Sequence, residues 1–312
     1  MSTTPPPAPS STLTTSSTTT PTRALVLAGA GAAGNAWELG LIAGLADGGV
    51  DITNADLVVG TSAGSTVAAQ ITSGTAPSEL YAAILAEVPV PPSRVGVSTR
   101  PRTPQVSGPS YLEWSDAIIA ESSDPADLRR RLCAAALARD AAAGSPQNRW
   151  REIVASRLPS HDWPRQRVLI PAVDARTGEP VVFDRDSGID LVDAVAASTS
   201  AMTPYPVGAG RYLNGGYRRS ENADLAMGFD RVVVLSPFSG RTRMPLAWRM
   251  DLASQVADLH AAGSRVETVF PDARAGDVFD ANALDPSTRP PAARGGHAQG
   301  QALAATLAEF WG

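Results

Sequence analysis

Residues 56–65 read Asp-Leu-Val-Val-Gly-Thr-Ser-Ala-Gly-Ser. The apolar run at the start, closed by glycine, predicts a central strand that is buried on both faces. Residues 65–73 favour a helix. Gly60 to Gly64 matches the Gly-x-Ser-x-Gly pattern of a nucleophile elbow and lies between strand and helix, which is the context that this pattern requires. The sequence therefore predicts an outward-pointing Ser62 hydroxyl at the positive end of a helix.

A second glycine motif follows the first apolar run of the chain, residues 24–28. Gly29-Ala30-Gly31-Ala32-Ala33-Gly34 fits the dinucleotide-binding fingerprint. In such a site the next strand should end in an acidic residue that binds the ribose, whereas here it ends in Gly60-Thr61-Ser62. We therefore favour the alternative, in which backbone amides of the glycine loop stabilise the oxyanion that forms when a serine attacks an ester carbonyl.

The rest of the chain continues to alternate between strand and helix patterns. This alternation predicts an α/β fold, a three-layer sandwich with a mostly parallel central sheet and helices on both faces. We expect strands at residues 167–174, 181–183, 231–235 and 265–270, with the first two in a hairpin, and helices at residues 36–48, 111–120, 125–143, 146–158, 191–198, 246–261 and 299–310.

Two segments lack this alternation. Residues 1–22 are almost entirely Ser, Thr and Pro, which predicts a flexible tail ahead of one domain at residues 23–312. Residues 88–109 are rich in Pro, Ser, Arg and Gly and show no period, which predicts a long loop.

The composition limits the partners and the location that we expect. A net charge of −5 offers no basic stripe for nucleic acid or for anionic lipid surfaces. We therefore expect no nucleic-acid partner, and any membrane contact would be apolar, local and transient. The N-terminus lacks the features of a secretory signal, and no apolar run is long enough for a membrane span, so we expect a cytoplasmic protein. All 26 cationic side chains are Arg, which is typical of a GC-rich genome and leads us to expect an actinobacterial origin.

The sequence gives no indication of a thiol or metal mechanism. Its single cysteine, Cys133, lies in a helical run rich in Ala, Leu and Arg, which indicates buried packing. No His, Cys, Asp and Glu residues have the spacing of a metal site. We therefore expect neither a metal nor an organic cofactor.

Four segments resemble those of bacterial patatin-like phospholipases and occur in the same order. The resemblance spans about residues 23–312 and implies a serine acyl hydrolase of lipid-type acyl esters, with a Ser-Asp dyad and a glycine-rich oxyanion loop. It places the nucleophile at Ser62, the oxyanion loop at Gly29, Gly31 and Ala32, and the base at position 214. The segments are residues 25–41, 60–65, 196–204 and 212–216, the last reading Tyr-Leu-Asn-Gly-Gly.

Two residues depart from the family pattern. The family often has Arg in the glycine loop where this chain has Ala33. The larger departure is Asn214, which stands where the family has the dyad aspartate. A neutral carboxamide cannot take the serine proton, so we expect this form to be inactive or severely impaired. Asn214 is then either a deliberate replacement that silences the enzyme and keeps substrate or product bound, or the mark of a natural pseudoenzyme.

Other mechanisms and functions stay open. A Ser-His-Asp triad would need His161, His260 or His297, although Ser62 comes earlier in the chain than the serine of α/β-hydrolases usually does. Arg218 and Arg219 indicate an exposed charged turn rather than a phosphate site. Phospholipids, lysophospholipids and simple esters are all candidate substrates, with an apolar acyl channel beside residues 88–109. The alternatives are a lipid-binding protein without catalysis and an acyltransferase to a small biosynthetic acceptor.

Overall fold

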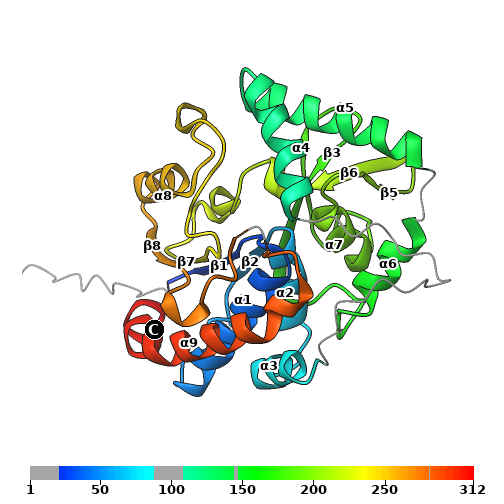
Figure 1. Cartoon of the computed structure of the whole chain (residues 1–312). Coiled ribbons are helices and arrows are strands. Elements are labelled where there is room, and N and C mark those ends of the chain that lie inside the picture. Colours follow the sequence, from blue (N-terminus) through cyan, green and yellow to red (C-terminus); the bar gives the residue numbers. More distant parts are fainter. Residues whose placement is uncertain (1–20, 88–107, 144–146, 281) are drawn as a thin grey trace, which may run out of the picture.

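The computed structural model describes residues 21–87, 108–143, 147–280 and 282–312. These residues contain a sheet of eight strands with helices on both of its faces (Figure 1). The strand order is β5-β6-β3-β2-β1-β7-β8, and β4 pairs with β3. The strands are β1 (Arg23–Leu27), β2 (Leu57–Gly60), β3 (Arg167–Asp174), β4 (Pro180–Phe183), β5 (Tyr205–Val207), β6 (Gly210–Asn214), β7 (Arg231–Leu235) and β8 (Arg265–Val269).

The centre of the sheet is parallel, and one side of it is antiparallel. Strand β1 pairs in parallel with β2 and β7, and the parallel part continues through β3 and β8. Leu27 and Gly60 are in register, so the carboxyl ends of β1 and β2 lie side by side. Strand β6 is antiparallel to β3 and brings Asn214 opposite Ala172, beyond the part of β3 that pairs with β2. Three chain segments therefore meet at one edge of the sheet.

Helices cover both faces of this sheet, as the alternation of strand and helix predicts. Leu25 and Leu27 pack in the core beneath α1, α2, α3, α7 and α9, whereas Ala24 and Val26 pack against α8 and η2 on the other face. The predicted three-layer α/β fold is confirmed. The helices are α1 (Gly31–Asp47), α2 (Ala63–Ile71), α3 (Pro77–Leu85), α4 (Gly108–Glu121), α5 (Pro125–Ala143), α6 (Gln147–Ala155), α7 (Leu191–Thr199), α8 (Leu252–Ala261) and α9 (Arg289–Trp311), and η2 is a short 3-10 helix (Ala223–Ala226).

Helices α1 and α9 pack side by side with their backbones in close contact (Figure 1). A Cβ atom on Gly40 would lie 2.1 Å from the Ala293 carbonyl oxygen, and one on Gly296 would lie 2.3 Å from the Trp37 carbonyl oxygen. The prediction that α9 begins at residue 299 is wrong by ten residues. Glycines in its first half do not end the helix, because they allow this close packing against α1.

Other expected boundaries also need correction. The helix expected at residues 246–261 is a short 3-10 helix, η3 (Leu246–Trp248), followed by α8. Arg249 adopts left-handed backbone (φ 52), and the Asp251 side chain caps α8 by accepting from the Ser254 amide at 2.9 Å. The expected helices do not include α3, and the expected strands do not include β5 or β6. The hairpin of β3 and β4 is confirmed.

Most of the two segments without alternation lies outside the described residues. This applies to the predicted tail up to residue 20. Thr22, which the sequence assigned to the tail, donates a 2.8 Å hydrogen bond from its amide to the Asp230 carboxylate. The same applies to residues 88–107 and to the acyl channel expected beside them. Gly108 and Pro109, expected to end that loop, instead begin α4.

Candidate active site

Ser62 lies at the sharp turn between β2 and α2, in a backbone conformation that is unusual for a residue with a side chain. Its φ is 53° and its ψ is −120°, and it is partly exposed. The flanking glycines permit this turn. A Cβ atom on Gly64 would lie 2.2 Å from the Leu27 carbonyl oxygen, and one on Gly60 would lie 2.6 Å from the Gly64 carbonyl oxygen. Strained backbone of this kind persists only where its surroundings enforce it, which is common at functional sites.

The backbone of Ser62 is fixed by two buried serines. The Ser62 amide donates a 3.0 Å hydrogen bond to Oγ of Ser198, which is fully buried on α7. Oγ of Ser65 donates to the Ser62 carbonyl oxygen at 2.6 Å. The turn is therefore held from α7 as well as from its own helix.

Asn214, at the end of β6, is in direct contact with Ser62. Its Nδ2 donates to Ser62 Oγ at 2.9 Å, and its Oδ1 accepts from the Gly216 amide at 2.8 Å. Because the Gly216 amide can only donate, the carboxamide must turn its oxygen toward Gly216 and its NH2 group toward Ser62. The structure thus brings together the two residues that the sequence placed in one site.

The direction of this hydrogen bond matters for chemistry. A general base must accept the serine proton, whereas the Asn214 NH2 group donates to Ser62. A carboxylate in the same place would keep one oxygen on the Gly216 amide and turn the other toward Ser62 Oγ. The surroundings therefore suit an aspartate, and the carboxamide reverses the hydrogen bond.

Gly29 lies directly against Ser62. A Cβ atom on Gly29 would lie 2.8 Å from Cβ of Ser62 and 3.3 Å from its Oγ. Gly31 and Ala32 belong to the first turn of α1, so the expected loop is in part a helix N-terminus, where amides point outward and the helix dipole favours negative charge. Among the described residues, no acceptor is bonded to the amides of these three residues or of Ala63. These amides are therefore candidate donors to an oxyanion.

A C-terminal segment covers the first turn of α1. The Ala33 amide donates to the Ala283 carbonyl oxygen at 3.0 Å, and a Cβ atom on Gly31 would lie 2.4 Å from Cδ2 of Leu284. Ala33 itself is fully buried. The position where the family often carries Arg is thus part of a packed contact in this chain.

The three histidines are bonded elsewhere. His161 bonds through Nε2 to the Ala155 carbonyl oxygen at 3.0 Å, and His260 through Nδ1 to the Ser264 carbonyl oxygen at 3.0 Å. His297 bonds through Nε2 to the Asp47 carboxylate on α1 at 2.8 Å and stacks on Tyr81. In the described part of the chain, none of the three contacts Ser62. Ser62 Oγ instead accepts a hydrogen bond from Asn214.

Two side chains singled out in the sequence have structural contacts. Cys133 is buried on α5, and burial raises the pKa of its thiol to about 12, so it is a poor nucleophile at neutral pH. The expectation that Arg218 forms an exposed turn is wrong, because it makes a bidentate ion pair with Asp224 at 2.9 and 2.6 Å, with most of both side chains buried.

In residues 21–87, 108–143, 147–280 and 282–312, no three His, Cys, Asp or Glu side chains are grouped so that they could hold a metal ion. Over the same residues, every helix is too short or too polar to cross a membrane.

Comparison with known families identifies the chain. The sequence model of the patatin-like phospholipase family matches residues 25–227, which is more than half of the chain and includes Ser62 and Asn214. The chain belongs to this family. Patatin-like phospholipases are lipid acyl hydrolases, so this patatin-like chain is related to enzymes that act on lipid substrates. A search of curated proteins finds no match.

Two solved structures are similar to this patatin-like chain at low sequence identity. VipD from Legionella pneumophila is 15% identical, with a TM-score of 0.43 over 92% of this chain and 67% of VipD. The type III effector protein ExoU is 15% identical, with a TM-score of 0.38 over 90% of this chain and 54% of ExoU. The chain thus spans about half the length of ExoU.

The sequence did not indicate the side chains that hold the site together. Ser198 was part of a segment with family resemblance but had no assigned role. Thr61 and Asn222 are fully buried polar residues that contact each other through a 3.0 Å hydrogen bond. Asn222 adopts left-handed backbone with φ 58, a conformation in which asparagine is enriched, but this tendency alone does not point to a role at the site.

Proposed function

We propose that this chain is a serine acyl hydrolase for lipid-type acyl esters, which acts through an acyl-enzyme at Ser62, and that Asn214 leaves it inactive or severely impaired. The observation that carries the proposal is the 2.9 Å contact of Asn214 Nδ2 with Ser62 Oγ, with Oδ1 held by the Gly216 amide. Membership of the patatin-like family supports the lipid substrate class.

The proposed reaction has two steps. Ser62 Oγ attacks the ester carbonyl while an aspartate at position 214 takes its proton, and the amides of Gly29, Gly31 and Ala32 stabilise the oxyanion. The same proton then passes to the departing alcohol, which leaves an acyl group on Ser62. In the second step the carboxylate takes a proton from water as the water oxygen attacks the acyl carbon. The bond between that carbon and Ser62 Oγ then breaks, Oγ takes the proton back from residue 214, and the fatty acid is released. Asn214 cannot accept a proton in either step.

The first experiment compares this chain with its Asn214→Asp variant on chromogenic esters of increasing acyl chain length. We expect kcat/KM to rise roughly 10²- to 10⁴-fold, because a general base is restored. Adding Ser62→Ala to the Asn214→Asp variant should abolish this gain. Replacing each of His161, His260 and His297 by Ala should change the rate little. No gain from Asn214→Asp would contradict the proposed dyad.

A lipid-binding protein without catalysis is the second candidate. Asn214 itself favours it, because a carboxamide at the place of the base can hold Ser62 but cannot activate it. This candidate predicts that Asn214→Asp turns over no ester, while the parent chain and the variant bind a fluorescent fatty acid equally well. Turnover by the variant would exclude it.

A further inference from the structure

One buried side chain contacts the chain neighbours of both Ser62 and Asn214. Nδ2 of Asn222 donates to Thr61 Oγ1 at 3.0 Å and to the Gly215 carbonyl oxygen at 3.1 Å. Thr61 directly precedes Ser62, and Gly215 directly follows Asn214. A single carboxamide thus joins the serine elbow to the loop that begins at Asn214.

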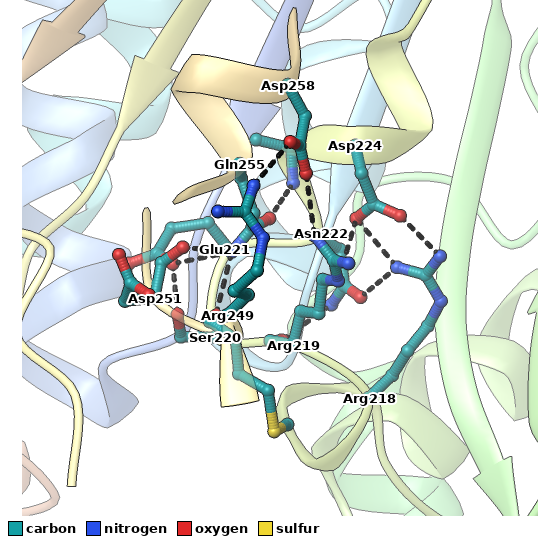
Figure 2. A network of polar contacts seen from close by, with 12 residues as sticks. Arg218, Arg219, Ser220, Glu221, Asn222, Asp224, Arg249, Asp251, Gln255 and Asp258 are labelled. Carbon is teal, nitrogen blue, oxygen red and sulfur yellow. Dashed lines mark hydrogen bonds and ion pairs between the residues drawn. The ribbon is translucent and has the colours of Figure 1, made fainter. Parts of the chain in front are cut away.

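The orientation of the Asn222 side chain is fixed at both ends. The Arg219 carbonyl oxygen is a third acceptor at 3.0 Å from Nδ2, so the two hydrogens of the NH2 group are shared among three acceptors, and Oδ1 accepts from Arg218 Nη1 at 2.8 Å. Figure 2 shows Asn222 beside the Arg218–Asp224 ion pair, which in turn holds the guanidinium in place. Since a guanidinium can only donate, the Asn222 oxygen must face it, and the NH2 group must face the elbow and the loop.

The backbone around Asn222 is also held in place. Its φ of 58° and ψ of 33° are left-handed, a conformation in which asparagine is enriched among residues with side chains. On one side, the Glu221 carboxyl accepts from Ser236 Oγ at 3.0 Å. On the other, the Ala223 amide donates to Gln255 Oε1 at 2.7 Å. Figure 2 shows Glu221 and Gln255 close to Asn222. These contacts hold the chain on both sides of Asn222 and leave its side chain little freedom.

We propose that Asn222 is a positioning residue, which keeps the serine elbow and the Asn214 loop at the spacing that a hydrogen bond between Ser62 and residue 214 needs. Its effect on turnover rests on the proposed function, whereas its effect on geometry does not. Loss of this spacing should slow the reaction, because a shift of about 1 Å in a reacting group can lower the rate on the order of 10²-fold.

The kinetic test uses Asn222→Gly in the Asn214→Asp background. Glycine accepts the left-handed backbone and removes only the side chain. We expect kcat per fluorophosphonate-reactive site to fall roughly 10- to 100-fold, with KM changed by less than about 3-fold, because positioning affects the reacting atoms more than substrate binding. An unchanged kcat would overturn the proposal.

Gln166→Ala is the matched control. Nε2 of Gln166 donates to the carbonyl oxygens of Thr53 and Ala55 at 2.8 and 2.6 Å, so it also bridges two segments. These contacts lie just before β2 and β3 begin, at the ends of the strands that are farther from Ser62. We expect this variant to lose stability while its kcat stays that of the Asn214→Asp background. An equal fall in kcat in both variants would show a general structural effect and overturn the proposal.

Two further variants test whether the NH2 donors matter. Asn222→Asp keeps the shape and the acceptor for Arg218 but has no hydrogen to donate, so we expect a kcat as low as that of Asn222→Gly; a kcat equal to the background would contradict the donor role. Thr61→Val removes the acceptor on the elbow. When it is combined with Asn222→Gly, kcat should fall by less than the product of the two separate effects, since both substitutions break the same contact between Asn222 and Thr61. If Asn222→Gly does not fold, Thr61→Val carries the prediction of a lower kcat.

A crystal structure of Asn222→Gly in the chain with Asn214 tests the geometry without turnover. We expect the separation of Ser62 Oγ and Asn214 Nδ2 to increase from 2.9 Å to more than about 3.5 Å, beyond hydrogen-bond distance. A separation that stays the same would overturn the proposal. If the separation increases but Asn214→Asp turns over no ester, the proposed function fails and the positioning role stands.

Discussion

The elbow at Ser62 and the loop after Asn214 reach the same hydrogen bond by different means. The elbow depends on backbone contacts that only glycine allows, since Gly60 and Gly64 leave no space for a Cβ atom. The loop depends on buried polar side chains, above all Asn222 and Arg218, which satisfy one another. A local motif therefore encodes the first half of the site, and contacts between distant residues encode the second.

This difference predicts different responses to mutation. A steric clash in the elbow cannot be relieved without moving a central strand, because Gly64 packs on the last residue of β1. The loop is held by several hydrogen bonds, so the loss of one should lower the free energy of unfolding only moderately. Replacing glycines should thus cost more than replacing polar side chains.

The largest effect on stability is expected for Gly64→Ala. Its Cβ atom would lie 2.2 Å from the Leu27 carbonyl oxygen, so the free energy of unfolding should fall by about 3 kcal/mol or more, in the upper range for overpacking. Urea denaturation measures the change. Gly263→Ala is the control, because Gly263 has a φ of +95° but no atom within 4 Å of a built Cβ. It should cost about 1–2 kcal/mol. Equal losses would contradict the steric account of the elbow.

A smaller loss is expected for Arg218→Met in the loop. It leaves the Asp224 carboxylate and Asn222 Oδ1 without this partner, and we expect the free energy of unfolding to fall by about 2 kcal/mol, less than for a fully buried pair. The control is Arg249→Met, which breaks the more exposed ion pair with Asp258 and should cost less than about 1 kcal/mol. Urea denaturation measures both losses. Equal losses of unfolding free energy in the two variants would contradict a larger contribution from the more buried ion pair.

The smallest effect concerns Glu38, a fully buried residue of α1. Within the described part of the chain, neither of its carboxyl oxygens has a hydrogen-bond partner of normal geometry. Complete burial raises the pKa of Glu38 well above its ordinary value, and the nearby Ala28 amide offsets this only in part. Because the folded-state pKa is raised, protonated Glu38 is compatible with folding at low pH, and stability falls as pH rises above the pKa of the unfolded chain.

Replacing Glu38 by Met should remove this dependence on pH. We expect Tm to rise by on the order of 2 °C at about pH 8 and to change less at about pH 5, measured by thermal unfolding. The exposed Glu309, replaced by Met, is the matched control for the loss of a carboxyl group. An equal change in Tm at both pH values in the Glu38→Met variant would show that ionisation of Glu38 does not limit stability.

The sequence predicted the centre of the fold because its signals are local. The apolar runs of β1, β2 and β7 and the glycine spacing around Ser62 each lie within a few residues. Strands β5 and β6 were missed because they are short and contain Pro206 and Gly210. The start of α9 was misplaced because its glycines also occur in turns, and only the packing on α1 explains them.

The candidate site was predicted in part for the same reason. Ser62 and Asn214 belong to recognisable motifs, and the structure places them in contact, while their catalytic roles stay predictions. Asn222 carried no motif of its own, and its partner Thr61 lies 161 residues earlier in the chain. A contact of that kind depends on the complete fold, so no local pattern could indicate it.

The most direct test of the central claim is the rate at which a fluorophosphonate labels Ser62, followed by intact-protein mass spectrometry. We expect a single adduct that forms roughly 10²-fold or more faster on the Asn214→Asp variant than on the parent chain, because a carboxylate can take the serine proton. The adduct should be absent when Ser62→Ala is added. Equal labelling rates in the parent chain and the Asn214→Asp variant would contradict the claim that position 214 activates Ser62.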